Sequence, residues 1–105
     1  MSEAQAQEPR RSPEAPLYVD AFALCEWLLR RLGSDNQVLS RAICTRALGL
    51  LEDVALALKD RSREARVDSA DEQLITLRIQ LRMAQATGLL DEPQLLHALE
   101  AADNI

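Results

Sequence analysis

The chain is poor in the residues that interrupt helices and in those that favour strands. Its 105 residues include only three glycines and four prolines, and aromatic residues make up 3% of the composition. Val, Ile and Thr, which are enriched in strands, are outnumbered by the strong helix formers Leu, Ala, Arg, Glu and Gln. These absences argue against a sheet, and the sequence predicts an all-α protein.

Groups that could carry catalysis or bind a metal are also scarce. His97 is the only histidine, and no cysteine lies near it in the sequence, so neither a metal-ligand set nor a catalytic triad can be assembled around it. The carboxylate pairs Glu52-Asp53 and Asp71-Glu72 consist of adjacent residues, which point about 100° apart on a helix. His97 itself is expected on the exposed face of the last helix. We therefore expect a non-catalytic protein without cofactor or metal.

The cysteines and the lengths of the apolar runs predict where in the cell the protein is located. Cys25 and Cys44 lie inside apolar helical patterns without metal-ligand spacing, so we interpret them as reduced core residues. No apolar run approaches the roughly 18 residues of a membrane span, and the N-terminus lacks the apolar core of a signal peptide. These features predict a cytoplasmic protein that does not enter a membrane.

The charge of the chain is weakly suited to nucleic acid. The net charge of −5 argues against broad, non-specific binding to phosphates. Eleven of the twelve cationic residues are nevertheless arginines, which recognise carboxylate or phosphate groups better than lysines do. The simpler interpretation is a set of solvated helix faces. Possible nucleic-acid contacts are Arg41, Arg46, Arg78 and Arg82, with Arg61, Arg63 and Arg66 as further candidates.

Helical spacing of apolar residues begins after a polar N-terminal segment. Residues 1–16 contain three prolines and little apolar surface, and we expect them to form a disordered arm. Residues 17–105 contain four apolar segments with helical periodicity and short connections. Short connections make successive helices antiparallel neighbours. The sequence predicts one domain, an antiparallel up-down-up-down four-helix bundle.

Local signals predict where the first three helices begin and end. The first should span 17–32, with Gly33 as its stop. The second should open with a capping box at Ser34 to Gln37 and run to about residue 60. The third should follow a polar turn at 60–64 and end at Gly88. Its preferred N-cap is Ser62, and its alternative N-cap is Ser69.

The fourth helix has the clearest start signal. Asp91 is the expected N-cap, Pro93 suits the first turn, and Gln94 completes a capping box. Leu90 and Leu95 stand where a hydrophobic staple would form. The core positions predicted for the four helices are Leu17, Ala21, Leu24, Leu28 and Leu32; Leu39, Ile43, Ala47, Leu50, Val54 and Leu58; Val67, Ala70, Leu74, Leu77, Leu81 and Ala84; and Leu95, Leu99 and Ala102.

The helices carry more apolar surface than one core requires. On the third helix Ile75, Ile79 and Met83 form a second row nearly opposite the core stripe. The apolar arc of the second helix extends to Leu48, and covers about 180° where somewhat more than 100° would suffice. Trp27 lies outside the stripe of the first helix. Scattered surface apolar residues are normal, but a row of three predicts an interface. We expect a homo-oligomer with closed symmetry.

One segment resembles a known family. The stretch from Leu77 to Leu95, LRIQLRMAQATGLLDEPQL, is similar to the LR-x-x-LRLA-x-x-x-GLL-s-x-x-QY region of small bacterial four-helix bundle proteins. These are the accessory variability (Avd-like) proteins of diversity-generating retroelements and the related 23S rRNA intervening-sequence proteins. The segment Leu48-Gly-Leu-Leu-Glu looks like the family's AL-x-LLE, and Tyr18 and Trp27 suit its first helix.

The resemblance implies a homopentameric barrel, and some family members bind nucleic acid and a reverse transcriptase. Retroelement members are strongly basic, whereas this chain is acidic. We therefore predict a non-catalytic, self-assembling structural or protein-interaction module that forms a cyclic homo-oligomer. The alternative is an accessory protein that binds nucleic acid and a reverse transcriptase.

Overall fold

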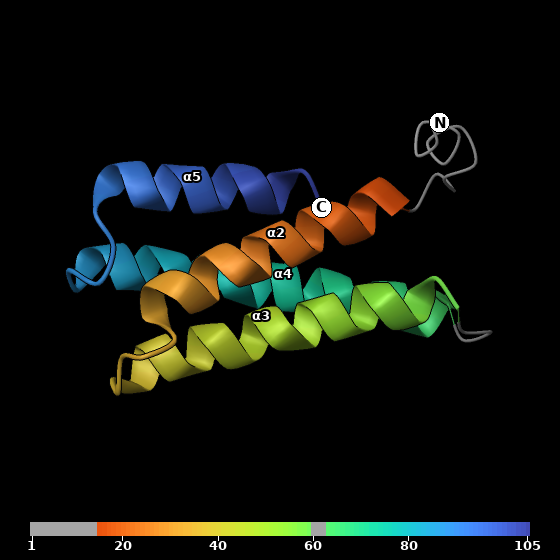
Figure 1. The fold of residues 1–105 in the computed structure, drawn as a ribbon, viewed down its shortest axis with the longest axis horizontal. Coiled ribbons are helices and arrows are strands. Elements are labelled where there is room, and N and C mark those ends of the chain that lie inside the picture. Colours follow the sequence, from red (N-terminus) through yellow and green to blue (C-terminus); the bar gives the residue numbers. More distant parts are fainter. Residues whose placement is uncertain (1–14, 60–62) are drawn as a thin grey trace, which may run out of the picture.

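The structure, a computed structural model, describes residues 15–59 and 63–105 and is all-α (Figure 1). No strand occurs in these two ranges, and this confirms the all-α part of the prediction. The helices are α2 (Ala15–Leu32), α3 (Val38–Ala57), α4 (Arg63–Ala86) and α5 (Glu92–Asp103).

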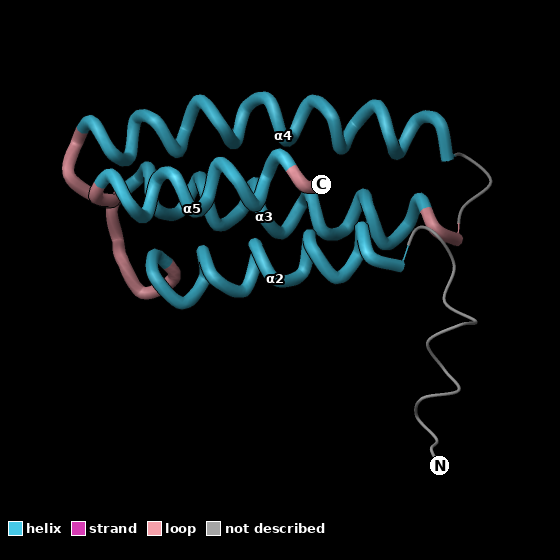
Figure 2. The backbone as a smooth tube through the Cα atoms, turned by 90° about the horizontal axis from the view of Figure 1, so that it is seen from above, coloured by secondary structure: helices cyan, strands magenta, loops and turns pink. Residues whose placement is uncertain are grey.

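The four helices contact one another in a cyclic order. α2 packs on α3, α3 on α4, α4 on α5, and α5 back on α2, whereas no Cα atoms of the diagonal pairs lie within 8 Å of each other. In Figure 1, α2 ends and α3 begins at the left, α3 ends and α4 begins at the right, and α4 ends and α5 begins at the left. Figure 2 shows α2 and α4 on opposite sides of α3 and α5. Each of the four helices therefore packs against two others.

The core consists mainly of leucine and alanine side chains, most of them from the predicted stripes. Leu28, Ile43, Leu50, Leu77 and Leu81 are fully buried, and each of the four helices contributes to the same cluster. On α5, the most deeply buried residues are alanines at 98 and 102, and the leucines at 95 and 99 are only partly buried. Small residues allow this short helix to approach its neighbours closely.

The prediction that Val67 belongs to the core is wrong. Val67 is exposed although its helical position lies close to the core stripe. Asp103, at the end of α5, accepts two hydrogen bonds from Arg78, so α5 ends level with the middle of α4. α5 has 12 residues and α4 has 24, so α5 does not reach the end of α4 that carries Val67.

The start of α3 differs from the prediction. Gln37 is the N-cap and makes no side-chain capping bond, so the predicted capping box at Ser34 is wrong. Instead, the carboxylate of Asp35 accepts a 2.9 Å hydrogen bond from the backbone N–H of Gln37. A short aspartate side chain competes in this way for nearby backbone donors, and α3 begins only at Val38.

The other helix limits follow the predictions closely. α2 begins two residues before position 17; the remainder of the predicted arm, 1–14, lies outside the described residues, as does Ser62. Glu64, expected in the turn, is already helical, and Ser69 lies inside α4 and is not its cap. Gly33 follows α2 directly, as predicted.

Gly88 ends the α4 region through its backbone conformation. Its φ of +88° is readily adopted only by glycine. The N–H of Leu89 donates to the carbonyl of Ala84 at 2.8 Å, and the N–H of Gly88 donates to the carbonyl of Gln85 at 3.2 Å. These two bonds form a Schellman motif, which satisfies carbonyls at the end of α4 and turns the chain towards α5.

The start of α5 is the predicted capping box. The Asp91 carboxylate accepts a hydrogen bond from the N–H of Gln94 at 2.8 Å, and the Gln94 amide oxygen accepts one from the N–H of Asp91 at 2.9 Å. Pro93 lies in the first turn. These contacts are local in sequence, and this explains why the sequence alone predicted them.

Replacing Asp91 with alanine should destabilise the protein. The change removes the acceptor for the Gln94 N–H, and the free energy of unfolding should fall by about 1 kcal/mol. Urea denaturation at one fixed protein concentration measures this. Asp91→Asn keeps an acceptor and serves as the control. Equal stability of the alanine variant and the parent would show that the capping box contributes nothing.

Candidate self-association surface

A row of exposed apolar side chains follows the outer face of α4. Ile75, Ile79 and Met83 are 58%, 61% and 53% exposed and stand one turn apart, so they lie in line along the helix. Leu77 and Leu81, which alternate with them, are completely buried on the other face. We call Ile75, Ile79 and Met83 the α4 ridge, and the structure brings these three predicted residues together.

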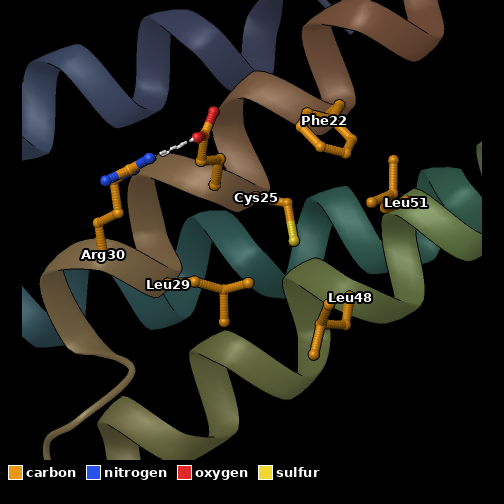
Figure 3. A pocket seen from close by; sticks show the side chains of 7 residues that line it. Phe22, Cys25, Leu29, Arg30, Leu48 and Leu51 are labelled. Carbon is orange, nitrogen blue, oxygen red and sulfur yellow. Dashed lines mark hydrogen bonds and ion pairs between the residues drawn. The ribbon is translucent and has the colours of Figure 1, made fainter.

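A second apolar surface lies between α2 and α3. It is a groove of about 390 Å³, and Figure 3 shows side chains from both helices around it. We call it the α2–α3 groove. It is lined by Phe22, Cys25, Glu26, Leu29 and Arg30 from α2 and by Leu48 and Leu51 from α3.

The exposed part of the groove is formed by large side chains. Phe22 and Leu48 are each about half exposed. The ring of Tyr18 lies 6.1 Å from the ring of Phe22, and this extends the apolar surface along α2. At the rim, Arg30 forms a 2.9 Å ion pair with Glu26. Of the predicted interface residues, Leu48 therefore belongs to the groove and not to the α4 ridge.

Trp27 lies on a different side of α2 from the groove. Its ring packs against the ring of His97 from α5, with the centroids 4.8 Å apart, and the guanidinium of Arg31 lies 4.7 Å from the Trp27 centroid. Trp27 is partly buried against the core. His97 is exposed, as predicted. The contact between the two rings was not predicted because it joins residues seventy positions apart.

The two cysteines are free and buried, as predicted. Burial raises the pKa of the Cys25 thiol, and the neighbouring Cys44 raises it further; burial also raises the pKa of Cys44. Both thiols are therefore neutral near neutral pH and are poor nucleophiles. Their contribution to stability is present below the ordinary thiol pKa and is lost as the pH rises through the raised folded-state pKa.

The native protein should resist thiol modification. At about pH 8, close to the ordinary pKa of a cysteine, iodoacetamide should modify Cys25 and Cys44 slowly, because both side chains are buried and neutral. In urea both should react at the rate of a free thiol. Mass spectrometry over time measures the two rates. Rapid labelling of either cysteine in the native protein would contradict the burial described above.

The arginines proposed for nucleic acid do not form one surface. Arg41 and Arg46 line a groove between α3 and α4, where Arg46 donates a 2.9 Å hydrogen bond to Gln73. Arg78 donates to Asp103 of α5 and so lies at the α4–α5 boundary. Arg82 is exposed and follows Ile79 by three residues. Within one copy, the four side chains are therefore divided between two sides of α4.

The arginines near the start of α4 are engaged in structural contacts. Arg66 donates to the Asp53 carboxylate at 3.4 Å, and the Ser69 hydroxyl donates to the same carboxylate. Arg63 also has a partner, and Arg61 lies outside the described residues. The buried Asp53 thus ties α3 to α4, whereas its neighbour Glu52 is exposed. The sequence pattern does not by itself distinguish Asp53 as a structural residue, although an acidic residue next to the apolar stripe is a signal for one.

Gly49 makes room for the polar contact between α3 and α4. A Cβ atom at this position would lie 2.7 Å from the side-chain nitrogen of Gln73, which is too close for an unmoved side chain. Because glycine leaves this space free, Gln73 can approach α3 and accept the hydrogen bond from Arg46. The contact fixes part of the α3–α4 boundary.

The described residues contain neither a cluster of metal ligands nor a helix that could span a membrane. Within residues 15–59 and 63–105, no three His, Cys, Asp or Glu side chains gather as potential metal ligands. No helix in those ranges has both the length and the apolar character needed to cross a membrane. No protein-family model, curated protein or solved structure matches this chain. The family resemblance therefore stays a prediction.

Proposed function

We propose that this protein is a non-catalytic module that assembles with copies of itself. The observation that carries the proposal is the α4 ridge, in which Ile75, Ile79 and Met83 are all more than half exposed on the face opposite the core. Burying a large aliphatic side chain completely is worth about 1.5–3 kcal/mol. A contiguous exposed apolar row of this kind is typical of an interface.

The assembly that we propose is a cyclic homo-oligomer of antiparallel up-down-up-down four-helix bundles. The cyclic order of helix contacts and the alternating ends of the helices in Figure 1 support this topology. Closed symmetry would cover the ridge of every copy. Five subunits is the number that the resemblance to Avd-like and 23S rRNA intervening-sequence proteins implies.

The contacts of the charged residues support a non-catalytic role. Arg78 pairs with Asp103, Arg66 with Asp53, and Arg30 with Glu26. Two of these pairs join neighbouring helices. The Arg30–Glu26 pair joins adjacent turns of α2 at the rim of the α2–α3 groove, whose other lining side chains are uncharged. The two free, buried thiols suit a reducing compartment, so the proposal includes a cytoplasmic location.

Ile79→Asp should dissociate the oligomer. The substitution places a charge in the middle of the proposed interface, where it would be desolvated without a partner, so the mass in solution should fall to that of a monomer. Size-exclusion chromatography with light scattering measures it. Leu96→Asp is the matched control, since Leu96 is 57% exposed but lies on α5.

Two results would contradict self-association through α4. One is a parent protein that is already monomeric at micromolar concentration. The other is an Ile79→Asp variant that retains the parental mass while Leu96→Asp does so too. Circular dichroism of both variants shows whether the helices remain folded.

The binding of nucleic acid and a reverse transcriptase is the alternative proposal. It is supported by the α3–α4 groove that Arg41 and Arg46 share, but Arg78 and Arg82 lie elsewhere and the chain is acidic. We expect no retention of structured RNA or duplex DNA by micromolar protein at low salt. A gel-shift series measures this. Binding that weakens steeply with salt and is lost in Arg41→Ala and Arg46→Ala would favour the alternative.

A further inference from the structure

We propose that the α4 ridge of one copy packs into the α2–α3 groove of the next copy. The proposal rests on the self-association proposed above and specifies the surface that receives the ridge. It is carried by four properties of the two surfaces: their shapes, their places on the bundle, their extent and the charges beside them.

The two surfaces are complementary in shape. The ridge is one row of side chains on one helix, and the groove is a depression between two helices. Ridges that enter grooves are the general mode of helix packing. From Ile75 to Met83 the ridge extends about 12 Å, and from Phe22 to Leu29 the groove extends about 10 Å at 1.5 Å per residue. The ridge therefore matches the groove in length.

The positions of the surfaces on the bundle define the type of contact. The groove lies between α2 and α3, whereas α4 has no Cα atom within 8 Å of one in α2 and lies on the opposite side of the molecule from it (Figure 2). The ridge and the groove thus face different directions. A contact between two different surfaces is heterologous, and it forms a ring if the rotation between copies closes.

The extent of the ridge argues against a contact between two ridges. Stable interfaces involve about 20–30 residues on each side, and the ridge provides three large apolar side chains. The groove adds Phe22, Leu29, Leu48 and Leu51 to the apolar contact. In a ring, each copy also uses both surfaces, so all the large exposed side chains of the ridge and groove become covered.

Each surface carries an exposed charge that has no ion-pair partner among the described residues. Arg82 stands beside the ridge, next to Met83 in the sequence. Glu52 follows Leu48, a residue that lines the groove, by one turn of α3. The other charges of the rim, Glu26 and Arg30, already pair with each other. Arg82 of one copy can therefore pair with Glu52 of the next. Such rim charges act more on orientation than on affinity.

A complementation experiment tests the proposal. Ile79→Asp disrupts the ridge and leaves the groove intact. Leu48→Asp disrupts the groove and leaves the ridge intact. Each variant alone should be monomeric. Mixed in equal amounts, the two should form a heterodimer, because one intact ridge meets one intact groove. Assembly should stop at two chains, since the remaining ridge and groove are both disrupted. Light scattering and native mass spectrometry measure the masses.

The outcomes separate this proposal from the proposed function. If Ile79→Asp is monomeric but Leu48→Asp assembles like the parent, the ridge mediates assembly and the groove does not receive it. If both single variants keep the parental mass, self-association through α4 fails as well. If both are monomeric and the mixture stays monomeric, the ridge and the groove do not meet. Each single variant at the same total concentration controls for non-specific association, Leu96→Asp alone should keep the parental mass, and circular dichroism controls for folding.

A charge exchange tests the orientation of the contact. Arg82→Glu and Glu52→Arg should each weaken association about twofold to fivefold, the usual effect of an exposed ion pair. The double variant carries the pair in reversed order and should regain the parental association. A double variant weaker than either single one would overturn the contact between Arg82 and Glu52. Sedimentation across a concentration series measures the association.

Discussion

The burial of one aliphatic face from each helix is the constraint on which the structure depends. Leu28 of α2, Leu50 of α3, and Leu77 and Leu81 of α4 are almost inaccessible to solvent, and all four helices contribute to one cluster. The direction of side chains around a helix repeats every 3.6 residues. The residues that α4 buries in the core therefore determine which of its residues point outward. The outward direction of the α4 ridge is therefore a consequence of the core.

Polar contacts at the helix boundaries complement this core. Asp53 joins α3 to α4 through Ser69 and Arg66, and Arg78 joins α4 to Asp103 at the end of α5. Arg66 and Arg78, which the sequence suggests as nucleic-acid contacts, therefore hold neighbouring helices together. Two of the surfaces left between and beside these contacts, the α4 ridge and the α2–α3 groove, are mainly apolar. This is why the proposed function is association and not catalysis.

Local sequence patterns predicted helix ends well where only one side chain could cap the free backbone N–H groups. The capping box at Asp91 is confirmed because both of its bonds lie within four residues. At Ser34 two short polar side chains competed, and Asp35 took the backbone N–H. The prediction that Val67 is a core residue failed for a different reason. Its exposure depends on where α5 ends beside α4, and the apolar periodicity of α4 does not specify the length of a neighbouring helix.

The sequence by itself determined the all-α class, the core faces and the α4 ridge, since each of these follows from spacing within one helix. The tertiary structure alone decided which surfaces arise between helices. Phe22 and Leu48 meet in one groove only because α2 packs beside α3, and Trp27 meets His97 only because α5 returns to α2. Residues distant in sequence become neighbours because whole helices pack together. The apolar periodicity of one helix does not specify which other helix it packs against.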